Sequence, residues 1–521
     1  MKFIEILASY MPSIIVKDLL RDEVASEKAP RRVVLPTVVM FADVSGFTKL
    51  SEAMARHGPE GAEYLTRHLN SYFSQMVKSI ASEGGDIFKF AGDAMIVLWP
   101  ESAGTLEQRA RHAVQCAESV QRALHEAKLE EGVTLSVKIG IGVGAVSILH
   151  LGGVLDRMEY VAVGDPLVQA FAAEEHCKAG GEVLVSPSVW ALVKDFIRPL
   201  EVLKDGFARI TEHGKGAPEG VFISRMPRKG KGGVGIELQL AGRAAEARLK
   251  QYTPGAIQTW ISPDALELES WGGDLRNVSV LFVNLGLRND DLLAAAKYRE
   301  PMHRVHEVLR TVQSAVYRYE GSVNKFLMDD KGSTLIAVFG LPPISHHDDS
   351  TRAVLAALAI CDGLWDLELQ ASVGVTTGVV FCGVVGSTTR KEYSVLGDTV
   401  NLSARLMQRA MTTGGGVIVD SQIVRATGSE LEYADLGEIS VKGKSNLIRI
   451  ARPYPAASVR EGLPLSSRPA NYPGTEPKLF KTAFLRQCAR VARQRRLRPM
   501  DLSVAPPDEA VAQPGDLAGA G

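Results

Sequence analysis

Two aspartates have the residue type and the setting for metal chemistry. Asp43 ends the apolar run VVMFAD and is followed by Val44, Ser45 and Gly46, and Asp93 lies in the short turn between IFKF and AMIVLW. Two carboxylates at adjacent strand ends can bridge divalent cations, and hard oxygen ligands suit Mg²⁺. Small residues after Asp43 let backbone N–H groups approach a phosphate. Either motif alone is better explained as an acid in a solvated turn, but the pair favours a metal and phosphate site.

A second pair of side chains, Asn401 and Arg405, suits a sugar and a phosphate. They lie four residues apart in NLSAR, on a predicted helix that begins after Gly397 and Asp398. Residues at this spacing share one face of a helix. An amide and a guanidinium on one face could hold a ribose and a phosphate together.

The chain contains one domain twice. VVMFADVSG is echoed by VLFVNLGL, GGDIFKFAGDAMIVLW by GSVNKFLMDDKGSTLIAVF, and YVAVGDPLVQA by YSVLGDTVNLSARL. Asn284 follows Asp43 by 241 residues, Lys325 follows Lys89 by 236, and Gly397 follows Gly164 by 233. Anchors that keep their order and nearly constant spacing indicate a duplication.

The two copies have lost complementary residues. The second copy has Asn284 and Asp329 where the first has Asp43 and Asp93, so it has lost half of its metal-binding charge. The first copy has Val168 and Ala172 where the second has Asn401 and Arg405. This pattern predicts one composite site at the interface of the copies and one degenerate site across a pseudo-two-fold axis.

Each copy reads as strand, helix, hairpin, helix and strand, which fits a ferredoxin-like α/β (α+β) core. In the first copy we expect helices over 64–81 and 106–127, strands at IFKF and AMIVLW, and a strand over 133–144. The predicted domains are an N-terminal helix or arm (1–35), the metal-bearing copy (36–225), a linker (226–270), the Asn/Arg-bearing copy (271–453) and a Pro/Ala-rich, basic and poorly ordered tail (454–521).

Composition indicates a soluble globular protein. The 521 residues carry 59 Lys plus Arg and 60 Asp plus Glu, which gives no support to general nucleic-acid binding. The five cysteines form no CxxC pair, and no uncharged apolar run approaches about 18 residues. Glu5 interrupts the apolar start of the chain, so we expect an amphipathic helix there and not a signal peptide. These features predict a cytoplasmic location.

FADVSGFTKLSE, GGDIFKFAGDAMIVLW and YSVLGDTVNLSARL resemble the motifs of class III nucleotidyl cyclases. A metal-bearing copy followed by an Asn/Arg-bearing copy is most similar to the tandem catalytic domains of soluble adenylyl cyclases, in their short, catalytic-core form. The resemblance covers roughly residues 1–455 and implies two cyclase domains that pair as a pseudo-symmetric intramolecular heterodimer. It also implies conversion of ATP to 3′,5′-cyclic AMP and pyrophosphate, in cAMP signalling.

The resemblance implies a role for each motif residue. Two Mg²⁺ or Mn²⁺ ions would be held by Asp43, Asp93 and the Val44 carbonyl. Phosphates would be bound by the backbone amides of Gly46, Phe47 and Thr48, and the terminal ones by Lys138. Arg405 would neutralise charge on the α-phosphate in the transition state, and Asn401 would orient the ribose.

The choice of purine should depend on Lys325, Ser394 and the Val395 backbone. A lysine donates to adenine N1, and a hydroxyl can accept from the 6-amino group. Guanine needs the reverse, and guanylyl cyclases typically carry Glu and Cys there. ATP is therefore favoured over GTP.

The degenerate site of this family binds bicarbonate through a lysine and an arginine. Lys89 matches the lysine, but Phe171, seven residues after Gly164, stands where the arginine is expected. We therefore expect bicarbonate to stimulate this protein weakly or not at all.

Other interpretations remain open. The chain could be a guanylyl cyclase, or a catalytically dead cyclase-like scaffold or anion sensor. A ferredoxin-like RNA-binding module is disfavoured because the strands lack exposed aromatic doublets for base stacking. We expect a monomer, and the basic segment 478–498 is either an unstructured end or a short amphipathic helix for a partner, an anionic membrane or the cytoskeleton.

Overall fold

The computed structural model describes residues 3–21, 29–46, 50, 58–91, 94–125, 127–128, 134–211, 243–258, 273–329, 332–428, 431–441 and 447–455. Phe47, Thr48, Asp93 and the predicted basic tail lie outside the described residues. None of the helices in the described part is long and apolar enough to cross a membrane.

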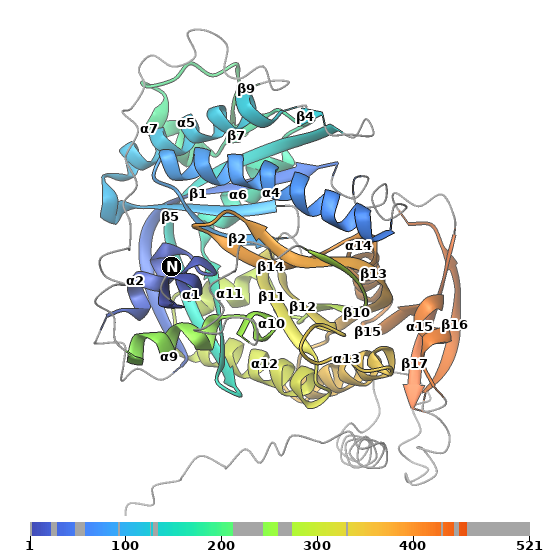
Figure 1. The fold of residues 1–521 in the computed structure, drawn as a ribbon. Coiled ribbons are helices and arrows are strands. Elements are labelled where there is room, and N and C mark those ends of the chain that lie inside the picture. Colours follow the sequence, from blue (N-terminus) through green and yellow to red (C-terminus); the bar gives the residue numbers. More distant parts are fainter. Residues whose placement is uncertain are drawn as a thin grey trace, which may run out of the picture.

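Two sheets of the same strand order form the frame of the molecule (Figure 1). The first runs β2 (Asp86–Ala91), β3 (Ala94–Pro100), β1 (Arg31–Ser45), β5 (Thr134–Val154), β7 (Val183–Val185), β9 (Ala208–Thr211) and β8 (Glu201–Val202), while β4 (Ala127–Lys128) and β6 (Arg157–Val163) also pair with β5. The second runs β11 (Ser322–Asp329), β12 (Gly332–Phe339), β10 (Asp274–Asn284), β13 (Ser372–Gly386), β15 (Gly416–Asp420), β17 (Ile448–Pro455) and β16 (Leu431–Ile439), while β14 (Lys391–Leu396) pairs with β13. The predicted duplication and mixed α/β class are confirmed.

Amphipathic helices complete each copy. The first copy has α4 (Gly58–Ser82), α5 (Leu106–Leu124), α6 (Asp165–Glu175) and α7 (Pro187–Val193). The second has α11 (Asn289–Ala295), α12 (Arg299–Arg318), α13 (Asp349–Trp365), α14 (Asp398–Thr412) and α15 (Ser421–Ala426). On α12, Val305, Leu309, Val312 and Val316 recur at helical spacing and are at most 1 % exposed, so one stripe of the helix packs into the core.

Two predicted helix boundaries are corrected. The helix expected over 64–81 begins earlier, at Gly58. The helix expected over 106–127 begins as predicted, where the Thr105 hydroxyl accepts the Gln108 N–H, but it ends at Leu124. Ala127 instead pairs with Leu135 in a short antiparallel ladder. Local pairing with β5 therefore replaces the last turn of the predicted helix.

The N-terminal segment forms two helices and not one. Helix α1 (Phe3–Ser9) and helix α2 (Ser13–Leu19) are separated at Pro12, which has no N–H to continue a helix. The Asp86 carboxylate on β2 accepts the N–H groups of Ser13 (3.0 Å) and Ile14 (2.7 Å) at the start of α2. The segment thus packs on the first copy, with a carboxylate at the start of α2, where negative charge is favourable.

Part of the predicted linker is helical. Helices α9 (Arg243–Tyr252) and α10 (Gly255–Gln258) lie in it, and Leu249 of α9 is fully buried in an apolar cluster with the N-terminal helices. The Tyr252 hydroxyl lies 2.8 Å from His150 Nδ1 on β5. Figure 1 shows α1, α2 and α9 together on one side of the molecule. The linker thus secures the N-terminal helices to the first copy.

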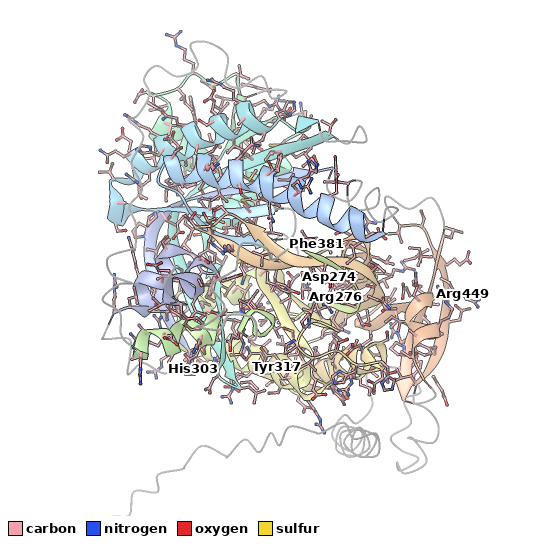
Figure 2. The ribbon with its side chains drawn as sticks, in the orientation of Figure 1. Asp274, Arg276, His303, Tyr317, Phe381 and Arg449 are labelled. Carbon is pink, nitrogen blue, oxygen red and sulfur yellow. The ribbon has the colours of Figure 1, made fainter. Side chains whose placement is uncertain are left out.

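The two copies exchange arms. The far half of β13 places Phe381 and Val385 in the core beneath α4 of the first copy, where Gly386 exchanges hydrogen bonds with Asn70 (3.3 Å) and Ser74 (3.2 Å). Figure 1 shows β13 and β14 running beside α4, and Figure 2 labels Phe381 on this arm. In return, the far half of β5 and β6 lies against α12, and the Gln313 amide donates to the Arg157 carbonyl at 2.9 Å. The predicted pseudo-symmetric heterodimer within one chain is therefore present.

Candidate active site

Asp43 lies near the end of β1, directly opposite Ala94 on β3 and Lys138 on β5. Directly opposed residues of antiparallel strands project from the same face of a sheet. The Asp43 and Lys138 side chains are both half-buried, and Lys138 Nζ lies 4.0 Å from a carboxylate oxygen of Glu174. Asp93 lies outside the described residues, but Ala94, which follows it, faces Asp43 across the ladder. The strand register therefore places Asp43 beside Ala94 and Lys138 at one end of the sheet.

Gly46 follows β1 with a φ of +101°, which favours glycine. A Cβ at this position would lie 2.5 Å from the carbonyl oxygen of Thr134, so the backbone passes too close to β5 for any side chain. The Gly46 carbonyl accepts the Leu50 N–H at 3.2 Å. The chain thus makes a tight approach just after Asp43, as a phosphate-binding loop requires.

Asn401 and Arg405 lie on α14, which begins after Gly397. Both side chains are half-buried, while Leu402 and Leu406 point into the apolar contact between α14 and its sheet. The predicted shared helix face is confirmed.

Lys325 and Ser394, predicted to read the purine, lie together. Lys325 Nζ donates to Ser394 Oγ at 3.2 Å and to the Phe90 carbonyl of the first copy at 2.7 Å. Both side chains are 1 % exposed. Val395 follows on β14, 4 % exposed and opposite Cys382. Phe90 precedes Asp93 by three residues. The hydrogen bond from Lys325 to the Phe90 carbonyl therefore joins the predicted purine pocket to the strand that leads to the predicted metal-binding turn.

Lys89 occupies the pseudo-symmetric position. Its Nζ donates to the Phe326 carbonyl of the second copy at 2.9 Å and to the Tyr160 carbonyl at 3.3 Å, and it lies 4.0 Å from Glu159 Oε2. Burial lowers the pKa of Lys89 and raises the pKa of Glu159. Val161 stands where the second copy has Ser394. The pocket around Lys89 and Val161, which we call the twin pocket, therefore has the lysine of the predicted purine pocket but lacks its hydroxyl.

Phe171 lies on α6 and packs edge-on against Phe41 of β1, with 4.9 Å between ring centroids. Phe41 lies opposite Ile96 of β3, and Ile96 lies opposite Lys89 of β2. Phe171 and Lys89 therefore lie over the same face of the first sheet, with Phe41 and Ile96 between them.

Sequence reasoning missed two buried carboxylates, Glu159 and Glu392. Each precedes the tyrosine of a repeated motif, MEYVAVGD and KEYSVLGD, at the same 233-residue offset as Gly164 and Gly397. Each lies near the lysine of its own copy, with Glu392 Oε1 at 3.4 Å from Lys325 Nζ. The repeated Glu-Tyr pair was a visible signal, but only the fold shows that the carboxylate turns toward the lysine.

The second copy closes the end of its sheet differently. Asn284 Oδ1 accepts the Gly286 N–H at 2.9 Å. The β11–β12 ladder has seven residue pairs and ends at Asp329 and Gly332, whereas the β2–β3 ladder has five pairs and ends at Ala91 and Ala94. The hairpin of the second copy is therefore the longer one, and Asp329 is the last residue of its first strand.

Among the described residues, no group of three or more His, Cys, Asp or Glu side chains is placed to hold a metal ion. Asp93 is not among them.

Both copies match the family described as the adenylate and guanylate cyclase catalytic domain, over residues 34–224 and 275–450. The chain belongs to this family. It is similar to adenylate cyclase type 10 of Homo sapiens, with 29 % identity over 450 residues, covering 82 % of this chain and 26 % of that protein. The protein of the same name from Rattus norvegicus is 30 % identical over 417 residues, covering 77 % of this chain and 25 % of the relative. The chain thus spans about a quarter of the length of these relatives.

A solved structure supports the fold of this cyclase-family chain. The class III adenylyl cyclase-like ATP-binding protein from Pseudomonas aeruginosa superimposes with a TM-score of 0.50 at 15 % identity. The match covers 80 % of this chain and 93 % of that protein. Paired cyclase-type domains in one chain therefore have a structural precedent.

Proposed function

We propose that this chain is an adenylyl cyclase with one composite active site between its two copies. The observation that carries the proposal is the buried contact of Lys325 with Ser394 and with the Phe90 carbonyl of the first copy. It combines an adenine-reading donor and hydroxyl from one copy with the strand that leads to Asp93 in the other. The twin pocket, with Val161, cannot present the same pattern. This asymmetry supports one substrate site and one degenerate site.

The purine preference follows from hydrogen-bond roles. The Lys325 ammonium can only donate, which suits the N1 acceptor of adenine and opposes the N1–H of guanine. Ser394 Oγ can accept from the 6-amino group of adenine. A buried site built for one hydrogen-bond pattern rejects the other because it leaves polar groups unpaired. ATP is therefore the proposed substrate.

The donor set at the end of β1 fits a pair of Mg²⁺ or Mn²⁺ ions. The half-buried Asp43 carboxylate lies opposite Ala94, the residue after Asp93, and carboxylate and carbonyl oxygens are the ligands these cations prefer. Asp43, Asp93 and the Val44 carbonyl would hold the ions. When bound, such ions lower the pKa of the ribose 3′-hydroxyl and neutralise phosphate charge.

The chain itself would bind and orient ATP. Phosphates would lie on the amides of Gly46, Phe47 and Thr48, with Lys138 reaching the terminal ones. Asn401 would orient the ribose, and Arg405 would stabilise charge on the α-phosphate. The 3′-oxygen then attacks the α-phosphorus in line, loses its proton to solvent, and the bond to pyrophosphate breaks.

We propose that bicarbonate does not bind at the degenerate site of this chain and does not stimulate its activity. The Lys89 ammonium lies near the Glu159 carboxylate and donates hydrogen bonds to two backbone carbonyls. An added anion would approach Lys89 beside the Glu159 carboxylate, whose negative charge repels it. Phe171 packs on Phe41 and contributes no donor.

Product identification tests the proposal. Purified protein is incubated with ATP or GTP and Mn²⁺ or Mg²⁺, and the products are identified by mass spectrometry. We expect cyclic AMP and pyrophosphate from ATP, only with a metal ion. Cyclic GMP as the main product would assign a guanylyl cyclase, and ATP binding without turnover would assign an inactive scaffold. Because the copies pair within one chain, we expect activity per chain to be independent of protein concentration.

A further inference from the structure

Glu392 is a buried carboxylate that no motif role uses. Its side chain is 11 % exposed, and Oε1 lies 3.4 Å from Lys325 Nζ. Oε2 accepts the Phe90 N–H at 3.1 Å and lies 3.4 Å from the Arg390 guanidinium. Both oxygens of Glu392 are therefore held by donors from two different copies.

Glu392 and Lys325 both form hydrogen bonds with the backbone of Phe90 in the first copy. The Phe90 N–H donates to Glu392, and the Phe90 carbonyl accepts from Lys325. Arg390 adds bonds to the carbonyls of Ile87 (2.9 Å) and Phe88 (3.1 Å) on the same strand. The ion pair is therefore fixed to β2 at both ends.

A buried lysine on a flexible stem needs such a counter-charge. Without it, the ammonium would be left partly unpaired in a site that is 1 % exposed, which is costly. The same arrangement draws the carboxylate toward donors of the protein, since Oε2 accepts the Phe90 N–H and Oε1 faces the Lys325 ammonium.

Resting on the proposed function, we propose that Glu392 is the positioning residue for purine selection. It holds the Lys325 ammonium where it donates to adenine N1, and its own oxygens are withheld from guanine by Lys325, Arg390 and the Phe90 N–H. Glu392 acts through Lys325 and does not contact the reacting atoms.

The degenerate site supplies a matched control. Glu159 has the same sequence context and faces Lys89 at 4.0 Å, with its side chain 15 % exposed. Both glutamates are therefore mostly buried and face the lysine of their own copy, and Glu392 additionally accepts the Phe90 N–H. They differ in which pocket they serve.

The test measures binding of 3′-deoxy-ATP and 3′-deoxy-GTP, which lack the attacking oxygen, by calorimetry with Mg²⁺. We expect Glu392→Gln to weaken 3′-deoxy-ATP about 10- to 100-fold and 3′-deoxy-GTP less than about threefold, since a buried charge loses its partner. Glu392→Asp should recover part of the loss. Glu159→Gln should leave the ratio of the two affinities within about twofold of wild type, because the purine is not read there.

A second measurement tests whether Glu392 affects purine affinity only through Lys325. In a Lys325→Met background, adding Glu392→Gln should not change the affinity ratio further, because the group that it positions is gone. Equal weakening of both nucleotides by Glu392→Gln, the same change from Glu159→Gln, or a full effect in the Lys325→Met background would overturn the inference. If the wild-type chain prefers the adenine nucleotide and the variants leave that preference intact, this inference alone fails. If the wild type binds neither nucleotide, the proposed function fails as well.

Discussion

At the scale of single residues, the proposed chemistry is divided between the copies. Asp43 lies on β1 of the first copy, and Arg405 lies on α14 of the second. Neither copy has the other's group at the equivalent place, where Asn284 and Ala172 stand. Each proposed role can therefore be removed by one substitution without touching the other copy.

We expect Arg405→Ala and Asp93→Asn each to lower kcat for cyclic AMP formation by about 10²- to 10³-fold, because each removes charge stabilisation needed in the transition state. The kcat of Asp329→Asn should stay within about twofold of wild type, because Asp329 pairs with Gly332 at the end of a strand pair in the second copy, away from the proposed metal site. Initial rates with ATP and Mn²⁺ measure this. A comparable loss from all three substitutions would mean that the degenerate site also matters, whereas a loss from Asp329→Asn alone would mean that the two halves have been assigned the wrong way round.

Bicarbonate sensitivity is also decided by single residues. Loss of one charged partner of a buried anion costs roughly 2–5 kcal/mol, or about 30- to 5,000-fold in affinity, which moves a millimolar site out of range. We expect no saturable activation of the wild-type protein in a bicarbonate titration at fixed pH and ionic strength. Activation should appear in Phe171→Arg and increase when Glu159→Gln is added, since that change removes the carboxylate facing Lys89. Clear activation of the unmodified protein at millimolar bicarbonate would disprove this account.

At the scale of secondary-structure elements, the β11–β12 hairpin of the second copy makes contacts that bear on the proposed loss of a metal site there. In the second copy, the Ser333 carbonyl accepts the Leu285 N–H at 3.1 Å, and the Ser333 hydroxyl donates to the Leu287 carbonyl at 3.3 Å. The long β11–β12 hairpin thus bonds to the loop that follows Asn284. Backbone groups of Leu285 and Leu287 in this loop are therefore already hydrogen-bonded within the protein.

Restoring the carboxylate should therefore not restore a metal site. We expect Asn284→Asp to leave the number of Mn²⁺ ions bound per chain unchanged in the presence of 3′-deoxy-ATP, because the neighbouring loop stays bonded to the hairpin. Electron paramagnetic resonance titration of free Mn²⁺ counts the ions. Asp43→Asn is the matched control and should reduce the count. An additional tight ion in Asn284→Asp would show that charge alone had disabled the second copy.

At the scale of the whole molecule, each copy completes the core of the other. Leu149 and Leu151 of the first copy lie in the apolar cluster of the second, and Phe381 and Val385 of the second lie in the cluster of the first. A third cluster joins both sheets to the N-terminal helices and α9. Separating the copies would expose all three clusters.

We therefore expect one calorimetric unfolding transition. Leu309→Ala in α12 and Met76→Ala in α4 remove fully buried side chains from different copies, each at a cost of about 2–5 kcal/mol. Both should lower the temperature of the same transition. Two transitions, with only one shifted by each variant, would show that the copies fold independently.

Local pattern in the sequence was enough to predict much of this protein. Apolar periodicity and turn residues predicted the duplicated strands and helices, and the spacing of Asn401 and Arg405 predicted their shared helix face. The complementary losses predicted one composite and one degenerate site. The boundaries were less accurate, as at Leu124, because strand pairing of Ala127 with Leu135 replaces the last turn of the predicted helix.

The buried ion pairs, the exchanged arms and the closed second hairpin depend on tertiary structure. Glu392 bonds to Phe90, 302 residues away, and Lys89 bonds to Phe326, 237 residues away. No local pattern encodes such contacts, because a glutamate beside a tyrosine has the same propensity whether it faces solvent or a buried lysine. Its partner is chosen only when the two copies pack together and exclude water, since only then does an unpaired charge become costly enough to decide where each side chain points.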